Sequence, residues 1–312
     1  EIDPGSLISA ILKAPADLLW FGGIGTYVKA ASQNNAEVGD PANDALRVDA
    51  EDLRVKAVGE GANLGTTQAA RIAFSAKGGR INTDFIDNSA GVDCSDNEVN
   101  IKIALNREMA EGRLAQETRD ALLVRMTDDV AELVLEDNRL QALALSIAEK
   151  GGSAAVASYV RLMETFEASG RLDRKVEGLA ANDELLRRAA EGRGLTRPEL
   201  AVLLSTAKLA LQEAIEKSSL PDDPALASDL AAAFPAEMQR DFAAAIADHQ
   251  LRREIIATKI ANRIINRMGI VHPFELVEEE GCALGDIAAA FVAVERLLGM
   301  PAIWTALDDA KI

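Results

Sequence analysis

The chain has 312 residues, a formal net charge of −17, and only two Cys and two His. This length exceeds what one hydrophobic core usually fills, so we expect two domains. The acidic excess disfavours nucleic acid and anionic membrane surfaces as partners, because like charges repel. Two widely separated cysteines exclude a disulfide-built or cysteine-rich zinc scaffold, and we predict no metal site. Without an apolar run of roughly 18 residues or an export signal, we expect a cytoplasmic protein.

Up to about residue 104, turn-forming residues alternate with short apolar runs. Residues 17–21 predict a short buried strand, which runs into the glycine loop of residues 22–26. Residues 54–58 predict a second strand, which ends in the sequence Gly-Glu-Gly-Ala-Asn at residues 59–63. Each predicted strand is therefore followed by a loop of small residues.

A helix and a third strand are expected next. Thr66 or Thr67 is a suitable N-cap for a helix that runs through Ala76, because a threonine oxygen accepts an orphan N–H of the first turn. A short strand is expected from about Arg80 to Phe85. Strand, loop, helix and strand in this order are typical of a parallel α/β sheet.

Beyond residue 104, helical patterning continues almost to the end of the chain. Apolar residues at helical spacing predict a helix over 251–268, and Thr196 to Glu199 form a capping box ahead of another helix. We therefore predict α/β followed by all-α: a partial Rossmann-like parallel sheet, with the last strands of a dinucleotide-binding domain in residues 1–104, and a helical C-terminal domain in residues 105–312.

The predicted sheet is incomplete. Three strands are too few for a doubly wound domain, and no G-x-G-x-x-G follows a strand, so the first βαβ unit of a dinucleotide fold would be absent. The chain also begins at Glu1 without an initiator methionine. We therefore expect a fragment of a longer protein.

Three loops are candidates for ligand binding, at residues 22–26, 59–63 and 88–95. In open α/β sheets, ligands lie beyond the carboxyl ends of the strands, where loops present backbone N–H groups and small side chains. A tight turn needs the same glycines, and this alternative stays open for residues 22–26.

Four segments resemble the large-subunit class of bacterial NAD-specific glutamate dehydrogenases. They are DLLWFGGIGTYVKA, VGEGANLGTTQAARIAFSAKGGRINTDFIDNSAGVDCSDNEVNIKIAL and, later in the chain, GRGLTRPELAVLL and RREIIATKIANRIINRMG. The resemblance is most specific over residues 17–105. It implies that the chain holds the end of the catalytic dehydrogenase region and the start of a helical C-terminal region.

Smaller hexameric glutamate dehydrogenases carry an E-G-A-N motif and a later N-A-G-G-V-x-x-S-x-x-E motif. Residues 60–63 and 88–98 keep that spacing. The resemblance implies NAD as cofactor, and it implies glutamate or 2-oxoglutarate contacts for Val92 and Ser95. The residues that it implies for the cofactor are Gly22, Gly23, Gly25, Thr26, Gly61, Asn63 and Asn88. Asparagine offers both a donor and an acceptor to the nicotinamide carboxamide, and a serine hydroxyl donates to a carboxylate.

Several of these residues have structural alternatives. Asn63 is suited to a left-handed turn between glycines. Ser95 begins the sequence Ser-Asp-Asn-Glu, a capping box for a helix expected from about Asp96 to Gly112. Cys94 is interpreted as a packing residue, because no His lies near it in the sequence.

The resemblance places the catalytic lysine and aspartate of these enzymes upstream, so we predict no catalytic residue here. Phe21 and Asn97 depart from the family pattern, where a polar residue and a histidine are expected. The isolated chain is therefore expected to turn over no glutamate.

Two hypotheses follow. In the first, the chain is part of an NAD-dependent enzyme that converts L-glutamate and water to 2-oxoglutarate and ammonium, and its partners are the upstream portion and further copies in a homo-oligomer. In the second, it is a helical regulatory or assembly segment with no binding activity of its own.

Overall fold

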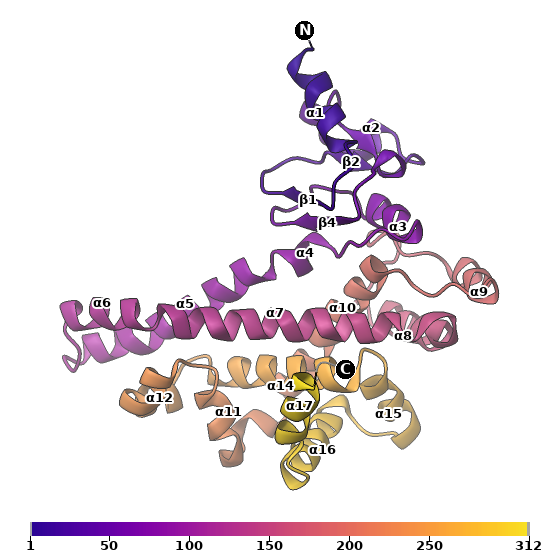
Figure 1. Ribbon diagram of the computed structural model, residues 1–312. Coiled ribbons are helices and arrows are strands. Elements are labelled where there is room, and N and C mark those ends of the chain that lie inside the picture. Colours follow the sequence, from indigo (N-terminus) through magenta and orange to yellow (C-terminus); the bar gives the residue numbers. More distant parts are fainter. Residues whose placement is uncertain (1, 311–312) are drawn as a thin grey trace. The chain divides into compact units, whose positions relative to one another are not determined.

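The computed structural model describes residues 2–310 (Figure 1). The chain divides into two compact units. The first unit comprises the residues up to Asp93 together with Asn138–Ser205, and the second comprises Cys94–Asp137 together with the residues from Thr206 onward. The domain boundary expected at residue 104 remains a prediction.

Short parallel strands form the centre of the first unit. Strand β1 (Leu18–Phe21) pairs in parallel with β4 (Ala57–Glu60), and Leu18 lies opposite Ala57. Strands β2 (Val28–Lys29) and β3 (Val48–Asp49) form a second parallel pair. The structure confirms the first two predicted strands, with the second displaced toward the glycines, and adds two strands that the sequence did not indicate.

The third predicted strand, from Arg80 to Phe85, is wrong. Arg80 forms only an isolated bridge to Ala57, and residues Asp84–Asp87 form the short helix α4 instead. The backbone leaves the sheet here because the Asp84 and Asp87 carboxylates accept hydrogen bonds from the N–H groups of Leu64 and Glu60, at 2.8 and 2.9 Å. A helical turn brings both carboxylates to the end of β4.

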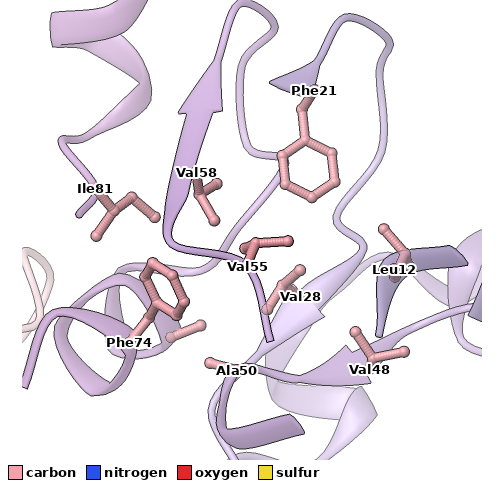
Figure 2. Close-up of a cluster of buried hydrophobic side chains, with 10 residues drawn as sticks. Leu12, Phe21, Val28, Val48, Ala50, Val55, Val58, Phe74 and Ile81 are labelled. Carbon is pink, nitrogen blue, oxygen red and sulfur yellow. The ribbon is translucent and has the colours of Figure 1, made fainter. Parts of the chain in front are cut away.

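Helix α3 (Gln68–Ala76) begins as predicted. The Thr67 hydroxyl oxygen accepts a hydrogen bond from the Ala70 N–H at 3.2 Å. The buried face of the helix joins the hydrophobic core of the first unit. Figure 2 shows this core, which consists of Leu12, Phe21, Val28, Val48, Ala50, Val55, Val58, Ala70, Phe74 and Ile81.

Beyond residue 104 the chain is helical, as predicted, whereas the helices α1 and α2 near the N-terminal end of the sequence were not predicted. The first unit also contains α1 (Pro4–Leu12), α2 (Asn35–Val38), α8 (Val156–Ala168) and α9 (Asn182–Ala190), and both units contribute residues to α5 (Ser89–Ala110), α7 (Thr127–Glu149) and α10 (Arg197–Lys217). The second unit contains α6 (Gln116–Arg125), α11 (Ala227–Ala231), α12 (Ala236–Asp241), α13 (Ala243–Ala247), α14 (Arg252–Met268), α15 (His272–Glu280), α16 (Leu284–Leu297) and α17 (Met300–Asp309).

Two predicted helix signals are confirmed. The Thr196 N–H donates to the Glu199 carboxylate at 2.7 Å, immediately ahead of α10. The isoleucines of α14 are buried on one face, as its spacing predicts. Within residues 2–310, no single helix meets the length and hydropathy needed to cross a bilayer, although α16 and α17, bent by 75°, do so as a pair.

Candidate functional site

A buried ion pair lies at the carboxyl end of β4. The Arg71 guanidinium of α3 donates to both carboxylate oxygens of Glu60, at 2.7 and 3.0 Å, and contacts the Asp84 carboxylate at 3.1 Å. Glu60 is fully buried and Arg71 nearly so. Burial raises the pKa of Glu60 above its usual range, although the Arg71 guanidinium opposes this rise.

These charged groups hold the loop of residues 61–66 in place. The Thr66 N–H donates to Glu60 at 2.9 Å, and the Leu64 N–H donates to Asp84. Leu64 has a φ of +60°, the only positive φ of a residue other than glycine between residues 2 and 310. The backbone hydrogen bond from Leu64 to Asp84 stabilises a conformation that L-residues rarely adopt.

Asp87 fixes the other side of the loop. Its carboxylate accepts hydrogen bonds from the Glu60 N–H and from the side-chain amide of Asn82, at 2.9 and 2.6 Å. Burial raises the pKa of Asp87, whereas these hydrogen bonds act to lower it. Arg71, Asp84 and Asp87 are therefore positioning residues that the sequence motifs did not reveal.

The structure brings the two predicted asparagines together. Asn63 follows the end of β4, and Asn88 follows α4. The Asn88 side-chain Nδ2 donates a hydrogen bond to the Asn63 Oδ1. The left-handed turn conformation belongs to Leu64 and not to Asn63, so the structural alternative for Asn63 is wrong.

Packing against a tryptophan explains why residue 61 is a glycine, which the sequence did not indicate. Trp20 of β1 lies over the backbone of Gly59 and Gly61, and a Cβ atom on Gly61 would lie 2.4 Å from the indole ring. On Gly59, a Cβ would lie 2.6 Å from the same ring. Gly61 thus leaves room for the Trp20 ring in this position, and a cofactor contact for Gly61 remains a prediction.

The loop of residues 22–26 is held by hydrogen bonds at two residues, Ile24 and Thr26. The Ile24 carbonyl accepts a hydrogen bond from the Tyr27 hydroxyl at 2.9 Å. The Thr26 N–H donates to the Asp40 carboxylate at 2.8 Å, and the Thr26 carbonyl accepts from Arg47 at 2.9 Å. These hydrogen bonds give buried Thr26 a structural role. The Thr26 N–H and the Asn43 side chain hold the pKa of Asp40 below its usual range.

The glycines of this loop differ from one another. Gly25 has a φ of +134°, and a Cβ there would lie 2.7 Å from Asn43. A Cβ on Gly23 would meet no atom within 4 Å, and one on Gly22 would meet only Trp20, at 3.8 Å. Gly25 is therefore a conformational glycine, whereas Gly22 and Gly23 leave an open backbone surface.

Phe21, which departs from the family pattern, is a core residue. Its side chain is buried in the cluster of Figure 2, and its ring is parallel to that of Tyr27 with centroids 6.0 Å apart. The aromatic residue at this position therefore contributes to the hydrophobic core.

Val92 and Ser95 are exposed residues of α5, and Val92 is 62% exposed. Because α5 begins at Ser89, Ser95 lies inside the helix, and the expected helix start at Asp96 with Ser95 as its cap is wrong. Cys94 is exposed, so its interpretation as a packing residue is also wrong. Val92 belongs to the first unit and Ser95 to the second. Within residues 2–310, no group of three or more His, Cys, Asp or Glu side chains is placed to hold a metal ion.

Comparison with known proteins identifies both parts of the chain. Residues 1–148 match the family described as bacterial NAD-glutamate dehydrogenase, catalytic domain. Residues 192–311 match the family described as glutamate dehydrogenase, C-terminal.

Three curated relatives are each named NAD-specific glutamate dehydrogenase. The Pseudomonas aeruginosa protein is 51% identical over 96% of this chain, the Halomonas elongata protein 43% over 100%, and the Mycobacterium tuberculosis protein 42% over 100%. The chain spans only 19%, 20% and 19% of these relatives, respectively. By sequence and by both family matches, the chain belongs to the bacterial NAD-specific glutamate dehydrogenases.

Proposed function

We propose that this chain forms part of the cofactor and substrate cleft of an enzyme that oxidises L-glutamate. The reaction converts L-glutamate, water and NAD⁺ to 2-oxoglutarate, ammonium and NADH. The observation that carries the proposal is the hydrogen bond between Asn63 and Asn88 beyond the end of β4. This is the edge at which parallel α/β sheets bind ligands.

The asparagine pair suits a carboxamide. Since Asn88 donates through Nδ2 to the Asn63 Oδ1, the Asn63 Nδ2 remains a donor and the Asn88 Oδ1 an acceptor for a ligand. A nicotinamide carboxamide offers the complementary acceptor and donor. NAD supplies hydride chemistry when bound, and the amide pair would orient its ring against the substrate.

The substrate contacts are proposed from the family motif. From that motif, Ser95 would donate its hydroxyl to the γ-carboxylate of glutamate without adding charge, and Val92 would contact the glutamate side chain. The exposure of both side chains on α5 supports this assignment. The backbone of Gly22, Gly23 and Gly25 would pass near the adenosine ribose, beside the anchored Thr26.

We also propose that residues 1–104 are the last part of a Rossmann-like domain and that residues 105–312 are a helical domain. Within residues 2–310, β1 pairs only with β4, so its other edge is available for further strands of the same polypeptide. The catalytic lysine and aspartate would come from an upstream portion of the same polypeptide. The complete enzyme is proposed to act in the cytoplasm as a homo-oligomer.

The kinetics of the complete enzyme test the proposal. Asn63→Ala removes one hydrogen-bonding amide, so we expect kcat/KM for NAD to fall about tenfold or more. Thr196→Ala is the control, because the Thr196 hydroxyl donates to the Glu199 carboxylate at the start of α10 and lies outside the asparagine pair. Its kcat/KM is expected to stay unchanged while its thermal stability decreases.

Two results would contradict the proposal. One is a complete enzyme that forms no NADH from glutamate. The other is an Asn63→Ala enzyme with lower thermal stability and unchanged kinetics, which would favour a helical assembly segment without a binding role.

A further inference from the structure

A polar cavity lies in the first unit, beside the start of β4. Its volume is about 730 Å³, which is within the range of small-molecule sites. Ala57 and Val58 line one side, and the turn after α3 contributes Gly78 and Arg80. Glu149, the last residue of α7, and Lys150, which follows it, line another side.

Basic side chains outnumber acidic side chains in this cavity. Arg80, Lys150 and Arg197 line it, with Glu149 as its only acidic residue, so its formal charge is +2. The chain as a whole has 50 acidic and 33 basic side chains. Because acidic side chains outnumber basic ones in the chain, the net positive charge of this cavity contrasts with the charge of the whole chain.

Arg197 is held rigidly at the wall of the cavity. Its guanidinium donates to the Ser146 hydroxyl at 3.0 Å, the Glu149 carboxylate at 2.9 Å, the Ala142 carbonyl at 3.0 Å, and the side chain of Asn82. Glu149 is thus the partner of Arg197.

Arg80 and Lys150 have no such partner. Within residues 2–310, neither side chain makes an ion pair or a hydrogen bond, and both are exposed. Two uncompensated cations that face one cavity, with the Ser75 hydroxyl on the same wall, match a doubly charged oxyanion. We propose that this cavity binds the phosphate group of a small molecule, either as free phosphate or as part of a phosphorylated metabolite.

This site is separate from the asparagine pair. The cavity includes Ala57 and Val58 at the start of β4, whereas Asn63 follows the end of that strand. A four-residue strand extends about 13 Å. Phosphate binding therefore does not depend on the proposed dehydrogenase function, and each proposal can fail without the other.

Isothermal titration calorimetry on the complete protein tests the proposal. Inorganic phosphate and ribose 5-phosphate are the two probes, and ribose is the uncharged control. We expect at least one phosphate probe to bind saturably, and binding of inorganic phosphate would point to the free anion while binding of ribose 5-phosphate alone would point to a metabolite. Arg80→Gln and Lys150→Gln are each expected to raise Kd about tenfold or more.

A matched variant controls for net charge. Lys175 is an exposed lysine of the same unit that does not line the cavity, so Lys175→Gln makes the same change of net charge and is expected to leave Kd within about twofold. The proposal is overturned if neither phosphate probe binds, if ribose binds as tightly as ribose 5-phosphate, or if Lys175→Gln weakens binding as much as Lys150→Gln. Circular dichroism of each variant verifies that the fold is retained.

Discussion

The two glycine-rich loops that follow β1 and β4 resemble each other in sequence and differ in how the protein holds them. The loop of residues 61–66 is fixed by buried carboxylates and Arg71, and Trp20 covers its first glycine. The loop of residues 22–26 is held by hydrogen bonds at Ile24 and Thr26, and Gly22 and Gly23 remain open. The glycines therefore have a packing or conformational explanation at Gly61 and Gly25, whereas a ligand contact at Gly22 and Gly23 remains a prediction.

The largest expected effect comes from breaking the buried ion pair. Arg71→Met leaves the Glu60 carboxylate buried without its partner, so we expect the free energy of unfolding of the chain to fall by about 3 to 5 kcal/mol. Urea unfolding followed by circular dichroism measures this change. Lys56→Met is the control, because the Lys56–Asp17 pair is almost fully exposed and its loss should have little effect.

The pH dependence of the same variant sharpens this prediction. Burial already raises the pKa of Glu60, and loss of Arg71 removes the opposing effect. A carboxyl whose pKa is raised in the folded state stabilises the fold at low pH, and this contribution is lost as pH rises through that folded pKa. Arg71→Met should therefore recover part of its stability as the pH is lowered toward the unfolded pKa of glutamate, about 4.3. A deficit independent of pH would contradict the buried-charge explanation.

A smaller effect is expected at the glycine beneath Trp20. Gly61→Ala places a Cβ against the indole ring, and we expect a loss of about 1 to 2 kcal/mol as the ring is displaced. The double variant with Trp20→Ala provides the control. If Trp20 is the cause, Gly61→Ala should cost almost nothing in that background. An equal cost in both backgrounds would point to backbone strain instead.

A still smaller loss of stability is expected at Asp40, which binds the end of the loop of residues 22–26. Asp40→Asn keeps an acceptor for the Thr26 N–H but removes the charge, so a smaller decrease in thermal stability is expected at pH 7 than for Gly61→Ala. The pKa of Asp40 is lowered in the folded state, so its stabilisation is present above the unfolded pKa and is lost as pH falls through the folded pKa. The difference in thermal stability between the unaltered protein and Asp40→Asn should therefore become smaller toward pH 3. A difference that does not change with pH would contradict a stabilising role of the Asp40 charge.

The sequence predicted features that depend on local patterns. Strand and loop spacing located β1 and β4, and the Thr67 cap fixed the start of α3, because both signals lie within a few neighbouring residues. The Asn63 and Asn88 motifs also pointed to residues that meet in space.

The remaining features depend on contacts between distant residues. Residues 80–85 were predicted as a strand, but Asp84 and Asp87 bond to the backbone at residues 60 and 64 and form a turn of helix. The Ser-Asp-Asn-Glu pattern suggested a helix start, yet α5 begins six residues before Ser95 and continues through it. Local capping signals cannot reveal either outcome, because a competing helix start or a distant backbone group decides it.

The smallest stability effect is expected for Gly23→Ala, and it tests why the first loop is open. A Cβ on Gly23 would meet no atom within 4 Å, so we expect the free energy of unfolding to change by no more than about 0.5 kcal/mol. If the backbone here approaches the adenosine part of NAD, the added methyl group should raise the KM for NAD in the complete enzyme while kcat changes little, because binding is weakened equally in the ground and transition states. Gly39→Ala is the matched control, because it also has open space around it but lies in a different turn, after α2. Its positive φ makes the alanine variant less stable without affecting the KM. An unchanged KM for Gly23→Ala would show that the open loop is only a turn, and that the two glycine-rich loops differ in anchoring alone.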